Sequence, residues 1–473
     1  MRVAVRREPV RGHVRVQFAF HRAGTGGPRH SCGQTDHDSA HPNDASTIGG
    51  ARVGAAVQPR SVRRVVACGV CAVSGPRRLR ISFFVHDLAS NPIGRAFPIA
   101  RALGHDFDVE ILGLLLSGDD VYLPYRGLAD YRTMRCSRDV HAVFHAGRLL
   151  ATRATGDIVY GFKPLATSFG PALWASGFGR RKPLFLDVED DEWVPMGTSG
   201  VDFVWRDIIR GWRHATAWKY TRLIHPLTAC ASGVTVVSRA LQRRYGGERV
   251  LHGPDEEVFD PDRTDLDSSV CRLAFGLPLD RRLALFSGLP QPHKGWDVLL
   301  GALTRSEASD WGLVLVGDRE HPEFERAAAR LQDRCYRLGY VPYPEQPRLL
   351  AAVDAVPVPQ LAVRFAQSQV SAKALDALAM RCPVIASRVG DFPEILAADS
   401  GEPRGWIVEP GDAADLARAL QRVAEDKADR DRRTLWGRRW FLREASAPAI
   451  RQRFSRLLSV SSPAFSGAPA DHG

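Results

Sequence analysis

Ser371, Lys373 and Asp376 bring a hydroxyl, a cation and a carboxylate together on one short segment. The stretch from Ala372 to Met380 is rich in good helix formers and predicts a helix that carries these side chains. A helix that connects parallel strands meets ligands outside the carboxyl ends of those strands. An aspartate inside a helix is otherwise unfavourable. The pattern therefore favours a sugar-nucleotide site over a plain core, and an exposed helical lysine remains the alternative for Lys373.

A second candidate site residue, Lys294, ends a loop that begins at Gly288. The loop follows a predicted strand, Leu283 to Ser287, and precedes a predicted helix, Trp296 to Leu303. Backbone N–H groups at a helix start favour anions, so Lys294 is placed where a phosphate could bind. The alternative is a solvated lysine at a helix start.

Two glycine turns are further candidates for ligand contact. Gly390-Asp391 follows the predicted strand Val384 to Ser387 and precedes Pro393-Glu394, which suits the first turn of a helix. The turn from Asn91 to Gly94 follows the first predicted strand. Both are also compatible with ordinary turns.

The elements that must position these residues alternate between strand and helix in two successive series, which predicts two doubly wound α/β domains with a ligand cleft between them. No G-x-G-x-x-G motif follows the first strand, which argues against a dehydrogenase. The predicted organisation comprises an N-terminal extension (1–78), a first domain (79–250), a connection (251–280), a second domain (281–435), a C-terminal helix (436–458) and a disordered tail (459–473).

The basic charge of the chain is concentrated near its start. Residues 1–80 contain 14 Arg and 4 acidic residues, whereas the remainder has 50 basic and 49 acidic residues. This segment lacks a sustained hydrophobic period, so we expect it to be disordered or absent from the natural product, with the fold beginning at Leu79-Arg80-Ile81. It also lacks interleaved aromatic residues, so a nucleic-acid-binding arm is the less favoured alternative.

Composition excludes several other classes of protein. The 473 residues contain no apolar run long enough to span a bilayer and no signal-peptide pattern. The eight cysteines lack a framework spacing, and the single Cys68-Gly-Val-Cys71 pair does not make a zinc site. The acidic run from Asp187 to Asp191 could hold a divalent metal, but a solvated loop is the preferred interpretation. We therefore expect a cytoplasmic protein with reduced cysteines.

One basic and aromatic stretch suggests a membrane surface. Residues 205–222 interleave four aromatic side chains with five basic ones, which suits an interfacial helix on anionic lipid. A helix that covers the first domain, with its arginines in solvent, fits the same pattern. Peripheral contact with the inner face of the plasma membrane remains an open alternative.

Residues 80–456 resemble the family-4 retaining glycosyltransferases, which have the two-Rossmann-domain fold called GT-B. The order and spacing of several short motifs carry the resemblance: VTVVSRALQRRYG, LHGPDEEVFDP, FSGLPQPHKGWDVLLGAL, LVLVGD, ALDALAMRCPVIASRVGDFPEI and GWIVEPGD. The resemblance implies an α/β fold of two Rossmann-like domains facing a cleft, with a C-terminal helix that can cross back to the first domain.

The resemblance also implies roles for individual residues. Lys294 would bind the donor diphosphate, and Asp376 would hold the nucleotide ribose. The family's second phosphate-binding cation falls on Leu289 and its first acid falls on Ser368, which are departures from the pattern. The remaining implied donor-side residues are Gly288, Gly295, Ser371, Lys373, Gly390 and Asp391. On the acceptor side the nearest matches are Gly94 and Asp187.

The implied activity is transfer of a sugar, with retention, from a nucleotide-diphosphate sugar to a hydroxyl acceptor. Such a hexosyltransferase-type enzyme serves glycan, glycolipid or small-molecule glycoside synthesis, and the resemblance implies no metal, no other cofactor and no nucleic-acid partner. Two alternatives stay open, a non-catalytic sugar-nucleotide or glycan-binding protein and a sugar-nucleotide epimerase. The epimerase would need acids and a histidine in the cleft, and Ser368 in place of an acid argues against it.

Overall fold

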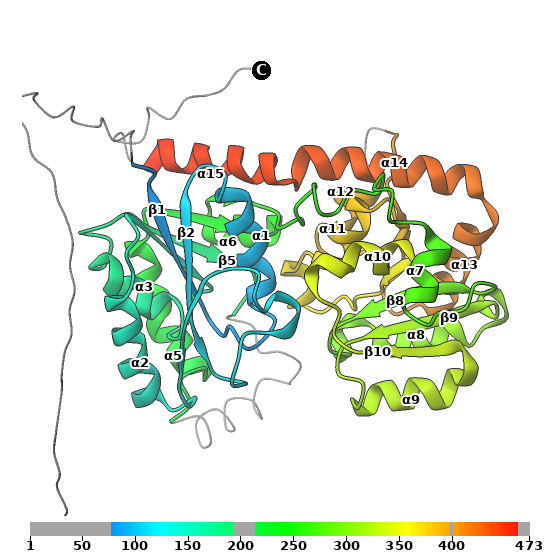
Figure 1. Ribbon diagram of the computed structural model, residues 1–473, viewed down its shortest axis with the longest axis horizontal. Coiled ribbons are helices and arrows are strands. Elements are labelled where there is room, and N and C mark those ends of the chain that lie inside the picture. Colours follow the sequence, from blue (N-terminus) through cyan, green and yellow to red (C-terminus); the bar gives the residue numbers. More distant parts are fainter. Residues whose placement is uncertain (1–76, 193–212, 398–400, 462–473) are drawn as a thin grey trace, which may run out of the picture. The chain divides into compact units, whose positions relative to one another are not determined.

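The computed structural model (Figure 1) describes residues 77–192, 213–397 and 401–461, with side chains through residue 459. These ranges all belong to one unit that extends from Val73 to Gly473. Most of the N-terminal extension and of the tail, and the start of the basic-aromatic stretch, lie outside the described residues. The first half of the fold is residues 79–250 and the second half is residues 281–435.

A parallel sheet of seven strands forms the centre of the first half. Its order is β3-β2-β1-β4-β5-β6-β7, so that the chain first winds outward from β1 to β3 and then reverses on the other side of β1. The point of reversal, between β1 and β4, is where a doubly wound sheet binds ligands. The strands are β1 (Arg80–Val85), β2 (Asp108–Leu115), β3 (Tyr131–Arg135), β4 (Ile158–Phe162), β5 (Leu184–Val188), β6 (Gly233–Val236) and β7 (Glu248–Arg249).

Helices connect these strands, as parallel pairing requires. They are α1 (Ile93–Leu103), α2 (Val140–Thr152), α3 (Phe169–Ser176), α5 (Trp218–Ile224) and α6 (Arg239–Tyr245). Neither β3 nor α2 was predicted from the sequence. The missed signal for α2 is its cap, because the Asp139 side chain accepts hydrogen bonds from the backbone N–H groups of His141 and Ala142.

The second half repeats the same winding. Two three-stranded parallel groups, β10-β9-β8 and β11-β12-β13, meet where Ala284 in β8 pairs with Ala355, just before β11. The backbone N–H of Leu285 donates to the carbonyl of Ala355 at 2.9 Å and joins the groups. The strands are β8 (Arg282–Ser287), β9 (Trp311–Val316), β10 (Cys335–Leu338), β11 (Val356–Val358), β12 (Val384–Ser387) and β13 (Trp406–Val408).

The helices of this half include those predicted to carry the site. They are α7 (Ser268–Ala274), in the predicted connection, and α8 (Trp296–Leu303), α9 (Pro322–Leu331), α10 (Gln346–Ala351), α11 (Ala372–Ala379), α12 (Phe392–Ala397) and α13 (Ala413–Glu425). The apolar faces of α8 and α13 pack together beneath the β8 and β9 strands around Trp296, Trp311 and Leu416. The loop that carries Lys294 is therefore anchored in this core, whereas the apolar residues of α11 pack in the other core of the fold.

The C-terminal helix differs from the prediction. Instead of one helix over residues 436–458, the structure has α14 (Lys427–Glu444) and α15 (Ala447–Ser461). The helix is interrupted at Ala445. The segment between the two halves passes close to this point, because a Cβ on Gly253 would lie 2.2 Å from the Ala445 carbonyl oxygen. Helix α14 packs on α11, and α15 crosses back to α1 in the first half (Figure 1). Phe454 of α15 packs against Phe107 and Phe185, with ring centroids 6.1 and 5.9 Å apart.

Candidate functional site

A cavity of about 360 Å³ lies between the two halves, at the carboxyl ends of both sheets. From the second half it is lined by residues that follow β8 and β11, and from the first half by residues that follow β1, β4 and β5. These strands flank the winding reversal of each sheet, where doubly wound folds bind ligands. The volume is within the usual range for small-molecule sites, from about 300 to 1,000 Å³.

Lys294 lines the cavity with its ammonium group poorly neutralised. Its Nζ donates a hydrogen bond to the carbonyl oxygen of Leu289 at 2.9 Å. Burial and, to a smaller extent, the nearby charge of Lys373 lower the pKa of Lys294 to about 7, against the opposing effect of Asp190. The Leu289 side chain is itself 49% exposed and supplies no second cation. An anion in the cavity would restore the charge that burial disfavours.

The two glycines predicted beside Lys294 have different roles. Gly288, at φ +97°, lines the cavity, and a Cβ there would lie 3.5 Å from the Lys373 side chain. Gly295, at φ +69°, is not part of the lining, and a Cβ there would lie 1.7 Å from the carbonyl oxygen of Pro359. The absence of a side chain at Gly295 lets two loops meet, and its predicted part in donor binding stays a prediction.

Helix α11 places Ser371, Lys373 and Asp376 on the cavity wall, as predicted. Burial raises the pKa of Asp376 to about 7, against the opposing effect of Lys373. Burial lowers the pKa of Lys373, and Asp376 and Glu189 oppose this shift. Neither charge is well solvated, so hydrogen bonds from a bound ligand would be energetically valuable here. By contrast, Ser368 is 4% exposed, and its hydroxyl donates to the Phe365 carbonyl oxygen at 2.8 Å.

The first half contributes a cluster of one lysine and three carboxylates. Lys163 contacts Asp190, Glu192 at 3.1 Å and Glu189 at 3.7 Å. Burial lowers the pKa of Lys163, but the carboxylates outweigh this effect and hold it above its usual value. Burial also raises the pKa of Glu189 to about 7, against the effect of Lys163. Lys163, Glu189 and Asp190 line the cavity, so the first-half wall has more carboxylates than cations.

Asp187 lies elsewhere, which corrects the predicted acceptor-side residue. Its side chain is fully buried within β5, where the Arg95 guanidinium donates to both carboxylate oxygens at 2.6 Å. Thr235 donates to the same carboxylate at 2.6 Å. The acids that reach the cavity, Glu189 and Asp190, come directly after the strand end. Strand termination was the signal that could have identified them. The other predicted acceptor-side residue, Gly94, does line the cavity.

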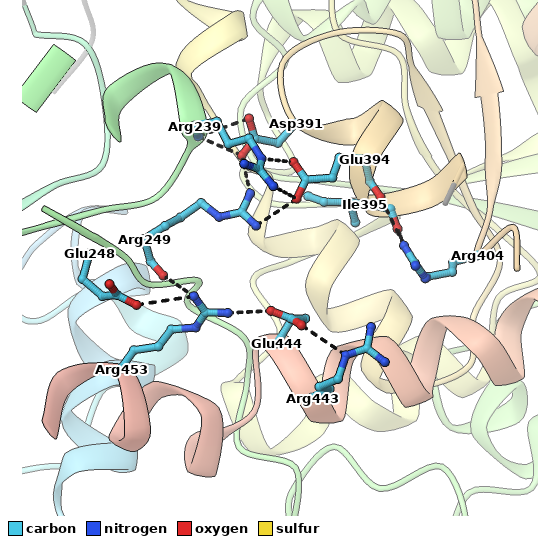
Figure 2. A network of polar contacts seen from close by, with 10 residues as sticks. All are labelled: Arg239, Glu248, Arg249, Asp391, Glu394, Ile395, Arg404, Arg443, Glu444 and Arg453. Atoms are coloured by element: carbon cyan, nitrogen blue, oxygen red, sulfur yellow. Dashed lines mark hydrogen bonds and ion pairs between the residues drawn. The ribbon is translucent and has the colours of Figure 1, made fainter. Parts of the chain in front are cut away.

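Asp391 also lies outside the cavity and instead joins the two halves (Figure 2). It is 5% exposed and accepts hydrogen bonds from the backbone N–H of Arg239 at 3.0 Å and from the Arg249 guanidinium at 2.9 Å. Glu394 of α12 pairs with the same two arginines. Gly390 provides the turn, at φ +57°, with a Cβ position 3.0 Å from the Gln367 carbonyl oxygen. The Asp391 side chain is therefore used in a contact between the halves, and the predicted role of Gly390 and Asp391 in donor binding stays a prediction.

The polar network of Figure 2 continues to the C-terminal helices. Arg453 of α15 donates to the carbonyl oxygen of Arg249 at 3.1 Å and pairs with Glu444 of α14 at 2.5 Å. At the cavity itself, the Gln369 amide of the second half donates to Asp190 of the first half at 2.7 Å. Aromatic rings also cross between the halves, since Tyr122 packs against Tyr340 with ring centroids 5.5 Å apart. The relative position of the cavity walls therefore depends on polar and aromatic contacts.

No helix among the described residues is long and apolar enough to cross a membrane. Nor does the described part of the chain contain a group of His, Cys, Asp and Glu residues suited to a metal ion. Residues 205–212 of the basic-aromatic stretch lie outside the described ranges, and in α5 the Arg222 guanidinium stacks on Trp218 at 4.6 Å. The expected membrane contact stays a prediction.

We predict that Asp391→Asn lowers the free energy of unfolding by about 2–3 kcal/mol, because it leaves a buried arginine only partly neutralised. Denaturant unfolding followed by circular dichroism measures this. Glu409→Gln is the matched control, since its pair with Arg388 is exposed and the expected change is below about 0.5 kcal/mol. Equal effects of the two substitutions would contradict the structural role given to Asp391.

The second half of the chain resembles known proteins in sequence. Residues 280–426 match the model of the family Glycosyl transferases group 1. A 2-deoxystreptamine glucosyltransferase of Streptomyces kanamyceticus is 27% identical over 244 residues, which cover 47% of this chain and 61% of that protein. A D-inositol 3-phosphate glycosyltransferase of a Nocardioides species is 34% identical over 204 residues, 39% of this chain and 42% of the relative. The chain thus spans less than two thirds of the length of these curated relatives.

Solved structures match a larger part of the chain. The Anabaena protein HepE, solved in complex with UDP and glucose, superposes with a TM-score of 0.61 at 17% identity, covering 80% of this chain and 99% of HepE. A sucrose-phosphate synthase from Thermosynechococcus elongatus has a TM-score of 0.57 at 18% identity, covering 81% and 98% of the two chains. The described residues therefore have the GT-B fold of two Rossmann-like domains, and residues 280–426 match the glycosyl transferases group 1 family.

Proposed function

We propose that this protein is a retaining glycosyltransferase, which moves a sugar from a nucleotide-diphosphate sugar to a hydroxyl acceptor in the cavity. The observation that supports this most is Lys294, a partly buried cation without a carboxylate partner at hydrogen-bond distance among the described residues, which lines one cavity with Lys373 and Asp376. The matched family and the UDP and glucose bound by HepE support the same class of donor.

In this proposal the second half binds the donor. Lys294 neutralises the diphosphate as a point charge, without the second cation that Leu289 fails to provide. Asp376 accepts hydrogen bonds from the ribose hydroxyls. As the bond between sugar and phosphate breaks, negative charge grows on the leaving diphosphate, and Lys294 stabilises it most at that stage. A cation supplied by the chain takes the place of a metal in this account.

The first half binds the acceptor. Glu189 and Asp190 line its wall and can accept hydrogen bonds from acceptor hydroxyls, while Gly94 lets the acceptor approach the backbone. Retention follows if the acceptor oxygen attacks from the face that the diphosphate leaves. The new bond joins the acceptor oxygen to the anomeric carbon, the bond to the diphosphate breaks, and the departing phosphate oxygen takes the hydroxyl proton.

Specific observations favour two other functions. The exposed Leu289 and the buried Ser368 fit a sugar-nucleotide-binding protein that has lost catalysis. His252 and Glu189 both line the cavity, so the acid and the histidine that an epimerase needs are available. Release of nucleoside diphosphate together with the fate of the sugar distinguishes all three functions.

We predict turnover of one nucleotide sugar from a panel of UDP- and GDP-sugars, with acceptors that include 2-deoxystreptamine and D-inositol 3-phosphate. Released nucleoside diphosphate measures the rate, and NMR of the product determines the anomer. Lys294→Ala should lower kcat/KM by about 10²–10³-fold, and Asp376→Ala should raise KM by roughly tenfold or more.

Lys427→Ala is the control for these variants, because Lys427 is 78% exposed in a surface pair with Asp431. Binding of a nucleotide sugar without release of nucleoside diphosphate would favour the binding protein. Inversion of one carbon of the sugar without a glycosylated acceptor would favour the epimerase. No binding of any donor would contradict the proposal.

We further predict that nucleoside diphosphate binding takes up a proton at Lys294. The free amine has a pKa of about 7, and a bound anion raises it, so affinity falls as the pH rises above 7. Calorimetry at pH 8 in buffers of different ionisation enthalpy measures the uptake. Lys294→Arg stays charged and should bind without this contribution. Equal proton uptake by the two proteins would contradict the assignment.

A further inference from the structure

Gln360 is a buried polar residue in the cavity wall that the sequence analysis did not identify. It comes two residues after β11, the strand at the winding reversal of the second sheet, and it lines the cavity. The residue is 4% exposed, and its Oε1 has no hydrogen-bond partner among the described residues. A buried amide oxygen left without a partner destabilises a folded protein, so its presence beside a cavity points to a ligand.

The backbone around Gln360 is fixed by the loop that carries Lys294. The N–H of Gln360 donates to the Val358 carbonyl oxygen, and the N–H of Leu361 donates to the His293 carbonyl oxygen, both at 2.9 Å. The absence of a side chain at Gly295 lets that loop approach Pro359. The segments that carry Gln360 and Lys294 are therefore braced against each other, and both residues line the same cavity.

The chemistry of an amide narrows the group that it can bind. The oxygen accepts hydrogen bonds, whereas ionised phosphate oxygens also only accept, so the partner of Oε1 must carry a hydroxyl or an N–H group. Ser368 cannot supply a contact here, since its hydroxyl is buried and bonded to the Phe365 carbonyl oxygen. The Gln360 oxygen is a neutral hydrogen-bond acceptor in the same cavity as the lysine proposed to bind the diphosphate. It can therefore accept a hydrogen bond from a hydroxyl of the sugar attached to that diphosphate.

We propose that the Gln360 side chain hydrogen-bonds a hydroxyl of the donor sugar and so selects which sugar is transferred. This inference rests on the proposed function and adds a residue that contacts the sugar of the donor rather than its nucleotide. A site built to pair with a hydroxyl discriminates strongly against a sugar that lacks it, because the buried amide is then left unpaired.

The first test compares nucleoside diphosphates with the corresponding nucleotide sugars as calorimetric probes, for wild type and Gln360→Met. The variant should bind the preferred nucleotide sugar roughly tenfold more weakly and the nucleoside diphosphate unchanged. Gln367→Met, at an exposed position of the same segment, is the control and should change neither affinity. Equal weakening of both probes, or no weakening, would overturn the role of Gln360.

The second test uses deoxy analogues of the preferred donor. In wild type one deoxy analogue should bind roughly tenfold more weakly than the parent sugar, and Gln360→Met should abolish that difference. The melting temperature of the free variant should stay the same or rise, because an unpaired buried amide is removed, whereas a structural role predicts a fall. If Gln360→Met fails to fold, a structural role is indicated and the inference is overturned, unless Gln360→Glu folds and keeps the deoxy discrimination.

These outcomes separate this inference from the proposed function. If wild type binds no nucleotide sugar, the proposed function fails. If wild type binds and transfers a sugar while Gln360→Met retains full discrimination among deoxy donors, only the inference about Gln360 fails.

Discussion

The Lys294 ammonium group lines the cavity with only a carbonyl oxygen as its hydrogen-bond partner among the described residues, and the rest of the site depends on this unpaired cation. A cation withdrawn from water is costly unless a negative group accompanies it. The nearest carboxylates are committed to Lys163 or face Lys373. A bound diphosphate would supply the missing charge, and the GT-B fold places the cavity where both sheets offer their ligand-binding ends.

Contacts between the two halves fix the position of one cavity wall relative to the other. One group, around Asp391 and Arg249, is largely buried and connects through Arg453 to the C-terminal helices. A second contact is the hydrogen bond from Gln369 to Asp190, which contributes about 0.5–1.5 kcal/mol. A third is aromatic, because Phe97 and Tyr125 of the first half pack against Tyr343 of the second half, with ring centroids 5.1 and 5.8 Å apart.

Much of the fold could be predicted because periodicity and caps are local signals. The helix Trp296–Leu303 and the strand Val384–Ser387 were predicted to the residue, since Gly295 precedes the helix and Pro383 precedes the strand. The split of the C-terminal helix was missed although a local signal was present, because Ser446 and Pro448 suit the start of a new helix.

Those site residues could be predicted whose position follows from a single loop or helix. Lys294, Lys373 and Asp376 are on predicted loops and helices and do line the cavity. Asp187 and Asp391 have suitable chemistry but are used within the protein, by arginines that are distant in the sequence. Gln360 was missed for the opposite reason, since nothing in the sequence indicates that its amide is buried and unpaired.

The most direct test of the central claim is a crystal structure of the full chain with the nucleoside diphosphate that binds most tightly. The account predicts the diphosphate within hydrogen-bond distance of Lys294 Nζ and the ribose hydroxyls beside the Asp376 carboxylate. Diphosphate density elsewhere, with Lys294 still bonded to the Leu289 carbonyl oxygen, would contradict it.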